Sequence, residues 1–142
     1  MRLLVILIFY CQIACSQASD SLTLINRVKA FNKKCENVNL DIELYSVNIK
    51  PFLDPYSNTD SIARRLYGSW KQLLSETHNF TTEVIGAKID RNNARVSISE
   101  IWNYEDGVTV CWFSITFWYK NNGIWYRENK KSELYKDGIR VR

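Results

Sequence analysis

The segment 108–120, VTVCWFSITFWYK, constrains the fold of this chain more than any other stretch. It is rich in β-branched and aromatic residues, which is typical of a β-strand. Side chains alternate between the two faces of a strand. One face would carry Val108, Val110, Trp112, Ser114, Thr116 and Trp118. The other would carry Thr109, Cys111, Phe113, Ile115, Phe117 and Tyr119. Both faces are largely apolar, so we expect both to be covered.

Alternating, β-branched sequence predicts four strands in the second half of the chain, at about 79–89, 94–103, 108–120 and 124–135. The links between them contain DRNN, YEDG and NNG. Asn, Asp and Gly adopt the positive φ angles that hairpin turns require. Successive strands joined by such short links form an antiparallel meander.

The first half of the chain is predicted to be mainly helical. Apolar residues at helical spacing indicate a helix over about 19–36, with the stripe Leu24, Val28, Phe31 and Cys35. A short helical turn at 40–45 is expected to lead into a strand at 47–53, which Pro51 would confine to an edge or a bulge. A second long helix, capped by Asn58 or Thr59, presents Ile62, Leu66, Trp70, Leu73 and Leu74. This order predicts an α+β domain with two or three N-terminal helices on one face of the sheet.

The helices can cover only one face of the segment 108–120. We assign Phe113, Ile115 and Phe117 to the face under the helices. The opposite face would then meet a second subunit, and its apolar residues are Val96, Ile98, Trp102, Trp112 and Trp118. On this assignment Cys35 and Cys111 can meet in a disulfide, with two buried free thiols as the alternative.

The N-terminus is predicted to be a secretory signal peptide at 1–16. Arg2 precedes an apolar run, and the small residues Ala14 and Ser16 suit cleavage after Ser16. The alternative is that Cys15 becomes a lipid-modified N-terminus. With residues 1–16 removed, residues 17–142 would form a single secreted, extracellular domain without a membrane span. The sequon at Asn79 then predicts N-glycosylation.

Few residues suggest metal or nucleic-acid chemistry. His78 is the only histidine, and the chain has no Cys-x-x-Cys pair, so no metal site and no cofactor are expected. The formal net charge is only +4, with much of the excess near the C-terminus, so we expect no nucleic-acid partner. Aromatic residues instead predict an apolar pocket, lined by Phe31, Trp70, Phe113, Phe117 and Tyr119.

The run LDIELYSVNIKPFLDPYSNTDSIARRLYGSWKQLL, followed by four long strands, resembles the nuclear transport factor 2-like superfamily, which includes SnoaL-like cyclases and ketosteroid isomerases. The resemblance covers about residues 20–136. It implies a cone-shaped (cystatin-like) fold, in which a curved sheet wraps around helices and leaves a pocket. It also implies a homodimer that forms through the convex face of the sheet.

The resemblance raises one catalytic hypothesis, for Asp54. In ketosteroid isomerases the general base is a carboxylate at the end of the short strand, in a context similar to Asp54-Pro55. Those enzymes also use a tyrosine of the first helix, but residues Val28 to Phe31 offer no hydroxyl. Alternatively, Asp54 accepts backbone N–H bonds in the turn before the helix. Glu100 is expected at the subunit surface, on the face of Trp112.

Three functions are consistent with these features. The favoured hypothesis is a secreted, non-enzymatic domain that binds an apolar small molecule or a protein partner, as a homodimer. The first alternative is an isomerase or cyclase-like enzyme that uses Asp54 as its general base. The second alternative is a scaffold whose pocket is filled by its own side chains.

Overall fold

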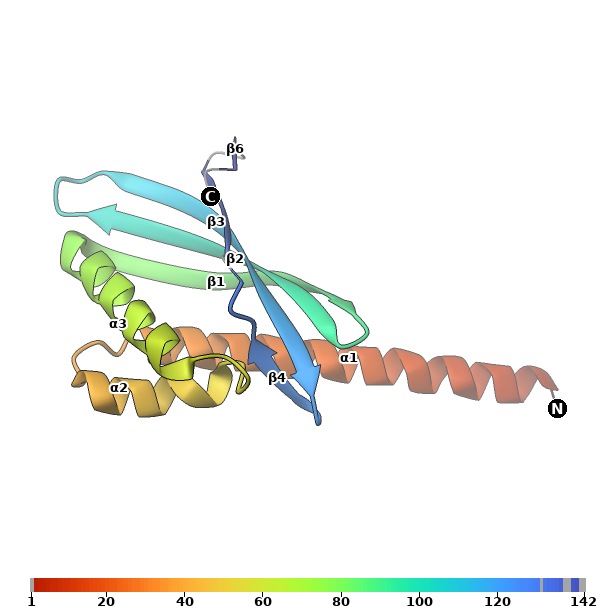
Figure 1. Ribbon diagram of the computed structural model, residues 1–142. Coiled ribbons are helices and arrows are strands. Elements are labelled where there is room, and N and C mark those ends of the chain that lie inside the picture. Colours follow the sequence, from red (N-terminus) through yellow and green to blue (C-terminus); the bar gives the residue numbers. More distant parts are fainter. Residues whose placement is uncertain (1, 131, 137–138, 141–142) are drawn as a thin grey trace.

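The computed structural model describes residues 2–130, 132–136 and 139–140 (Figure 1). The helices are α1 (Arg2–Cys35), α2 (Ile42–Ile49) and α3 (Thr59–Glu76), with the 3-10 turn η1 (Lys50–Phe52) after α2. The strands are β1 (Thr77–Asp90), β2 (Asn93–Tyr104), β3 (Thr109–Asn121), β4 (Ile124–Arg127), β5 (Glu133–Lys136) and β6 (Ile139–Arg140). No helix among these residues is long and apolar enough to cross a membrane.

The strands form the predicted antiparallel meander. β1 pairs with β2 and β2 with β3 along their lengths. β4 and β5 both pair with β3 on its other edge, β4 along 118–121 and β5 along 112–115. The fourth predicted strand is thus divided into β4 and β5. Gly107, Asn122 and Gly123 have positive φ angles in their hairpin links, as the turn sequences indicated, whereas in the first link the positive φ falls on Arg91 and not on an Asn or Asp.

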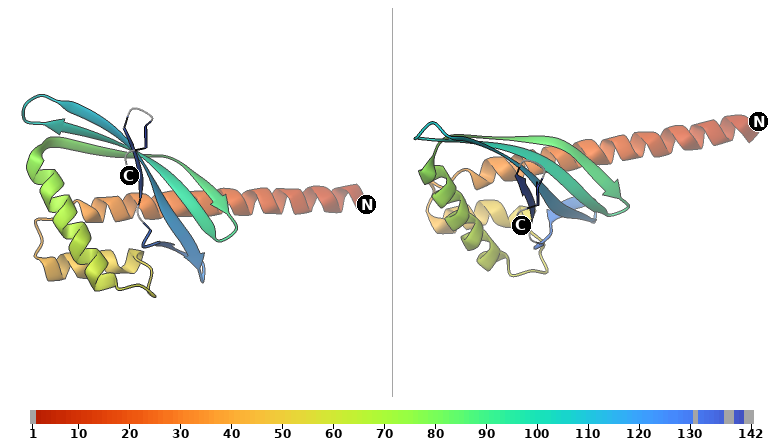
Figure 2. Two further views of the ribbon diagram at one scale, coloured as in Figure 1. Left: turned by 45° about the horizontal axis from the view of Figure 1, so that its top comes forward. Right: turned by 90° about the horizontal axis from the view of Figure 1, so that it is seen from above.

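The helices pack on one side of the curved sheet, so the α+β cone predicted from the sequence is confirmed (Figure 1, Figure 2). The apolar stripe of α1, which is Leu24, Val28, Phe31 and Cys35, is buried in the core. α1 begins at Arg2 in the structure, so it continues N-terminally from the predicted 19–36. The proposed cleavage after Ser16 would fall within this helix and stays a prediction.

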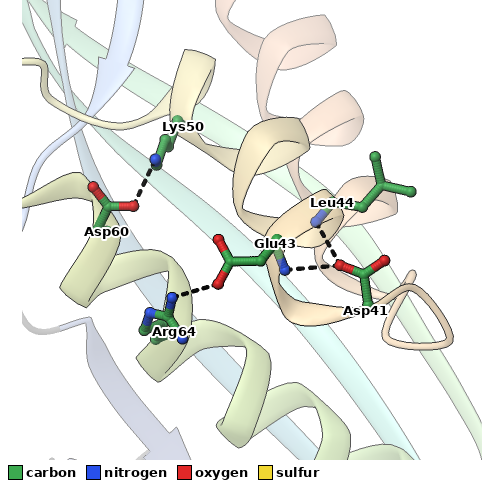
Figure 3. Close-up of polar contacts among 6 residues, drawn as sticks. All are labelled: Asp41, Glu43, Leu44, Lys50, Asp60 and Arg64. Atoms are coloured by element: carbon green, nitrogen blue, oxygen red, sulfur yellow. Dashed lines mark hydrogen bonds and ion pairs between the residues drawn. The ribbon is translucent and has the colours of Figure 1, made fainter.

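The predicted strand at 47–53 is wrong. Asp41 caps α2, because its Oδ1 accepts hydrogen bonds from the backbone N–H of Glu43 at 3.0 Å and of Leu44 at 2.9 Å (Figure 3). The helix then continues to Ile49, and Pro51 lies in the first turn of η1, where its missing N–H costs nothing. Only Leu53 pairs in this segment, through an isolated parallel bridge to Arg127.

Two ion pairs join α2 and η1 to α3 (Figure 3). Lys50 of η1 pairs with Asp60, and Glu43 of α2 pairs with Arg64. Both pairs lie at the surface, where each contributes little to stability. They do indicate how α3 is oriented over α2, with Ile62 and Ala63 buried against the core.

The sequence-based assignment of the two faces of β3 is wrong. Val96, Ile98, Ser114, Thr116 and Trp118 are buried under the helices. Trp102 and Trp112 are half-buried, and Trp102 lines the cavity under the helices. These apolar residues therefore do not form a free surface for a second subunit.

The residues predicted to lie under the helices occupy the outer face of the sheet. Phe113 is 36% exposed there, and Ile115 and Phe117 are half-buried. β3 is apolar on both faces, so its own pattern cannot choose between them. Its neighbour β2 can: Phe117 lies opposite Arg95, and Ile115 opposite Ser97. The polar side of β2 thus marks the outer face of the whole sheet.

The predicted disulfide is contradicted by the same reversal. Cys35 is buried in the stripe of α1, whereas Cys111 is exposed on the outer face of β3. Both thiols are free. The alternative of two buried thiols holds only for Cys35. Burial raises the pKa of Cys35 to about 12, so this thiol stays protonated and unreactive in the folded protein.

Candidate functional site

A cavity of about 380 Å³ lies between α1, α3 and the helix-covered face of the sheet. Much of its wall is aromatic or aliphatic, and the residues concerned are Phe31, Leu66, Trp70, Leu73, Ile98, Trp102 and Leu134. The polar side chains include Asn32, Arg65, Glu100, Ser114, Thr116, Arg127 and Ser132. Size and composition both match those of small-molecule sites, which span roughly 300–1,000 Å³.

Five residues were predicted to line this pocket, and the structure divides them. Phe31 and Trp70 lie on the cavity wall. The prediction for Phe113 and Phe117 is wrong, because both lie on the outer face of β3. Tyr119 also belongs to the outer face and does not line the cavity. Its hydroxyl donates a hydrogen bond to Asp54 instead.

Trp70 begins a row of aromatic rings that extends from α3 across the sheet. Trp70 and Phe80 meet edge to face at 5.1 Å between ring centroids. Phe80 lies 6.3 Å from Trp102, and Trp102 lies 5.4 Å from Trp112. Such contacts restrict the rotation of large side chains. The aromatic wall of the cavity is therefore held in place by rings outside it.

Glu100 is the one carboxylate among the described residues that line the cavity. The hydroxyl of Ser114 donates to its Oε1 at 3.0 Å, and the indole N–H of Trp102 donates to its Oε2 at 3.3 Å. Burial raises the pKa of Glu100, and the two hydrogen bonds oppose this more weakly. Glu100 therefore keeps its proton to higher pH than an exposed glutamate. We had expected it at the subunit surface, and the reversed faces of the sheet explain the difference.

Arg127 is the residue of the site that sequence reasoning missed. It ends β4, and its guanidinium lies 5.4 Å from the centroid of the Phe31 ring. One of its nitrogens, Nη2, donates to Ser132 Oγ at 3.0 Å. Its Nε is enclosed and has no hydrogen-bond partner within the described part of the chain. Burial lowers the pKa of Arg127. The sequence did contain a signal: residues two apart on a strand point to the same face, so Arg127 shares the face of Trp125, which is buried.

Asp54 occupies the turn between η1 and α3 and does not line the cavity. Its Oδ1 accepts from the backbone N–H of Tyr56 at 2.9 Å and from the hydroxyl of Tyr119 at 2.7 Å. Its carbonyl oxygen accepts from the N–H and the hydroxyl of Ser57. This is the turn role given above as the alternative. The structure does not support Asp54 as a general base acting on a molecule in the cavity.

Other candidate residues lie elsewhere. The described residues contain no group of three His, Cys, Asp or Glu side chains that could hold a metal ion. His78 and Asn79 are exposed at the start of β1. Asn79 is thus accessible to a glycosylating enzyme, and its modification stays a prediction.

Comparisons with known proteins find likeness of structure only. No protein-family model matches the chain, and no curated protein matches it. A de novo designed β-sheet protein superposes with a TM-score of 0.52 at 10% identity, over 88% of this chain and 94% of its own. A designed nuclear transport factor 2-like protein gives 0.48 at 14% identity, over 73% and 96%. An LEH-like epoxide hydrolase from M. tuberculosis gives 0.42 at 12% identity, over 76% and 83%.

At these identities the likeness is one of fold, and it says nothing about activity. The architecture itself is specific: helices α1 to α3 pack on a curved antiparallel meander, and a cavity lies between the two layers. The chain has a cone-shaped α+β fold, which it shares with the designed β-sheet protein.

Proposed function

We propose that this protein is a non-enzymatic binding module that holds an apolar small molecule in the cavity of its cone. The observation that carries the proposal is the cavity of about 380 Å³ with its wall of aromatic and aliphatic side chains. A scaffold filled by its own side chains would leave less room between its helices and its sheet, because protein interiors are normally close-packed. The third hypothesis from the sequence is thereby disfavoured.

A neutral fluorescent probe, N-phenyl-1-naphthylamine, tests this proposal. We expect its emission to rise when it enters the cavity and to fall when an apolar ligand displaces it. Leu73→Trp would place a larger ring in the cavity, whereas Gln72→Trp adds the same ring to the exposed side of α3. Binding should be weakened at least about tenfold by the first change and kept by the second. A wild-type protein that does not bind the probe would contradict the proposal.

A second candidate function is acid–base catalysis by Glu100. The observation in its favour is a buried carboxyl group with a raised pKa inside a cavity, which is a common property of catalytic acids and bases. This replaces Asp54 in the isomerase or cyclase hypothesis. Mass spectrometry of a ligand recovered after long incubation separates the two functions. An unchanged ligand supports a binding module, and a ligand converted by wild type but not by Glu100→Gln supports an enzyme.

We also propose that the protein is secreted, on the strength of the predicted signal peptide. The mass of the protein from its own cells should show residues 1–16 removed. A mass that includes these residues would contradict the proposal.

A homodimer is proposed through the outer face of the sheet, in place of the face predicted from the sequence. Phe113 and Ile101 are 36% and 39% exposed there, beside half-buried Ile115 and Phe117. Sedimentation should give a dimer that Phe113→Lys dissociates. A wild-type monomer at tens of micromolar would refute it, and capture of a different protein on this face would assign it to a partner instead.

A further inference from the structure

Two arginines from different elements line the cavity, together with Lys130. Arg127 ends β4, and Arg65 belongs to α3. Burial is the main cause that lowers the pKa of Arg127; Cys35 opposes it, and the positive charge of Arg65 lowers the pKa further. Their polar partners are neutral: Arg127 donates to the hydroxyl of Ser132, and Arg65 to the amide oxygen of Asn129 at 3.0 Å.

No carboxylate of the described residues forms an ion pair with either arginine. The nearby acidic residue Glu128 pairs with Lys130, which also lines the cavity and whose Nζ lies 5.6 Å from the centroid of the Phe117 ring. Buried cations in proteins are normally paired, because taking an unpaired charge out of water is costly. The enclosed Nε of Arg127 is a donor without an acceptor among the described residues, and Arg127 is one of the residues that line the cavity.

We infer that the cavity takes an apolar monocarboxylic acid, whose carboxylate binds Arg127 and whose body lies against Phe31, Trp70 and Leu73. This inference rests on the proposed function, since it names the class of molecule that the binding module would hold. A planar guanidinium is suited to a carboxylate, which can accept two parallel hydrogen bonds from it. The hydroxyl of Ser132 is available beside it as a further donor.

The other side chains that line the cavity explain why the ligand should carry only one acidic group and why the rest of the ligand should be apolar. Besides its polar side chains, the cavity offers a ligand the rings and aliphatic chains of Phe31, Trp70 and Leu73. The other ionisable group that is enclosed there, Glu100, is held by Ser114 and Trp102 on strands β2 and β3. A second anionic group of the ligand would meet this carboxyl group. A cationic ligand would meet Arg65 and Arg127.

The test compares three ligands with the same chain and different head groups: decanoic acid, decanol and decylamine. Each displaces N-phenyl-1-naphthylamine from the wild-type protein. We expect decanoate to displace the probe at roughly 10- to 100-fold lower concentration than decanol, as a charge-assisted hydrogen bond should give. Decylamine should be the weakest of the three. The preference for decanoate should shrink when salt is added.

Two variants locate the preference. Arg127→Gln should reduce it to less than about threefold while N-phenyl-1-naphthylamine still binds. Arg64→Gln is the matched control, because this arginine lies exposed on α3 and pairs with Glu43 away from the cavity. If Arg127→Gln does not fold by circular dichroism, Arg127→Lys keeps the charge, and it should retain part of the preference.

The outcomes separate the inference from the proposed function. Decanol or decylamine binding as well as decanoate would overturn the ligand class and leave the binding module standing. A preference that survives in Arg127→Gln, or one that is absent from both wild type and Arg127→Lys, would overturn the role of Arg127. Failure of the probe and of all three ligands to bind would overturn the proposed function itself.

Discussion

Replacing Trp118 with Ala tests which face of the sheet lies under the helices. Trp118 is fully buried, meets Phe31 edge to face at 5.7 Å, and donates its indole N–H to Thr116 Oγ1 at 3.0 Å. Truncating a buried Trp to Ala typically lowers the free energy of unfolding by about 3–5 kcal/mol. Phe113→Ala is the control on the outer face, where the side chain is 36% exposed. We expect it to cost about 1 kcal/mol.

Urea denaturation followed by far-ultraviolet circular dichroism measures both variants. With a slope of about 2 kcal/mol per molar urea, Trp118→Ala should lower the midpoint by roughly 2 M, and Phe113→Ala by roughly 0.5 M. The measurement is made at low protein concentration, so that contacts between subunits contribute little. Equal losses in the two variants, or a larger loss for Phe113→Ala, would refute the assignment of the faces.

Further predictions concern titration, thiols and the turn. Because burial raises the pKa of Glu100, the folded protein holds this proton more tightly than the unfolded chain does. The free energy of unfolding should therefore fall as the pH rises from about 4.3, the ordinary glutamate value, through the raised pKa. Glu100→Gln should flatten that fall, and an unchanged pH profile would contradict it. A thiol reagent should modify Cys111 in the folded protein and Cys35 only after unfolding; no free thiol in the denatured, unreduced protein would show a disulfide after all. Asp54→Ala should lower the free energy of unfolding by about 1 kcal/mol, because the hydrogen bonds of the turn are lost, and it should leave probe binding unchanged. Probe binding weakened by more than about tenfold would place Asp54 at the cavity instead.

The element types and the meander could be predicted because they depend on local patterns. The stripe from Leu24 to Cys35 is buried as its helical spacing indicates. The hairpins follow from turn residues such as Gly107 and Gly123, which adopt positive φ. The predicted strand at 47–53 failed because a capped helix and a proline-containing turn outweighed the extended pattern there.

The site was harder to predict, because it depends on which face of the sheet is covered. A strand such as β3, which is apolar on both faces, leaves that choice to its neighbours. In β2, Arg95 and Ser97 on one side and Val96 and Ile98 on the other contained the answer. With the faces reversed, Glu100 moved from the predicted subunit surface into the cavity. Arg127 ends β4 just before the break in the last predicted strand, where Asn129 and Ser132 favour a turn but no Gly or Pro marks its position.

The central claim, that the cone cavity binds a small molecule, is tested most directly by the indole N–H signals of the five tryptophans in a nitrogen-15 NMR spectrum. Trp70 and Trp102 line the cavity, and the indole of Trp102 donates to Glu100, whereas Trp125 is buried elsewhere in the core. On saturation with decanoate, the account predicts that the signals of Trp70 and Trp102 shift while that of Trp125 stays in place. A spectrum in which the Trp70 and Trp102 signals do not move would contradict it.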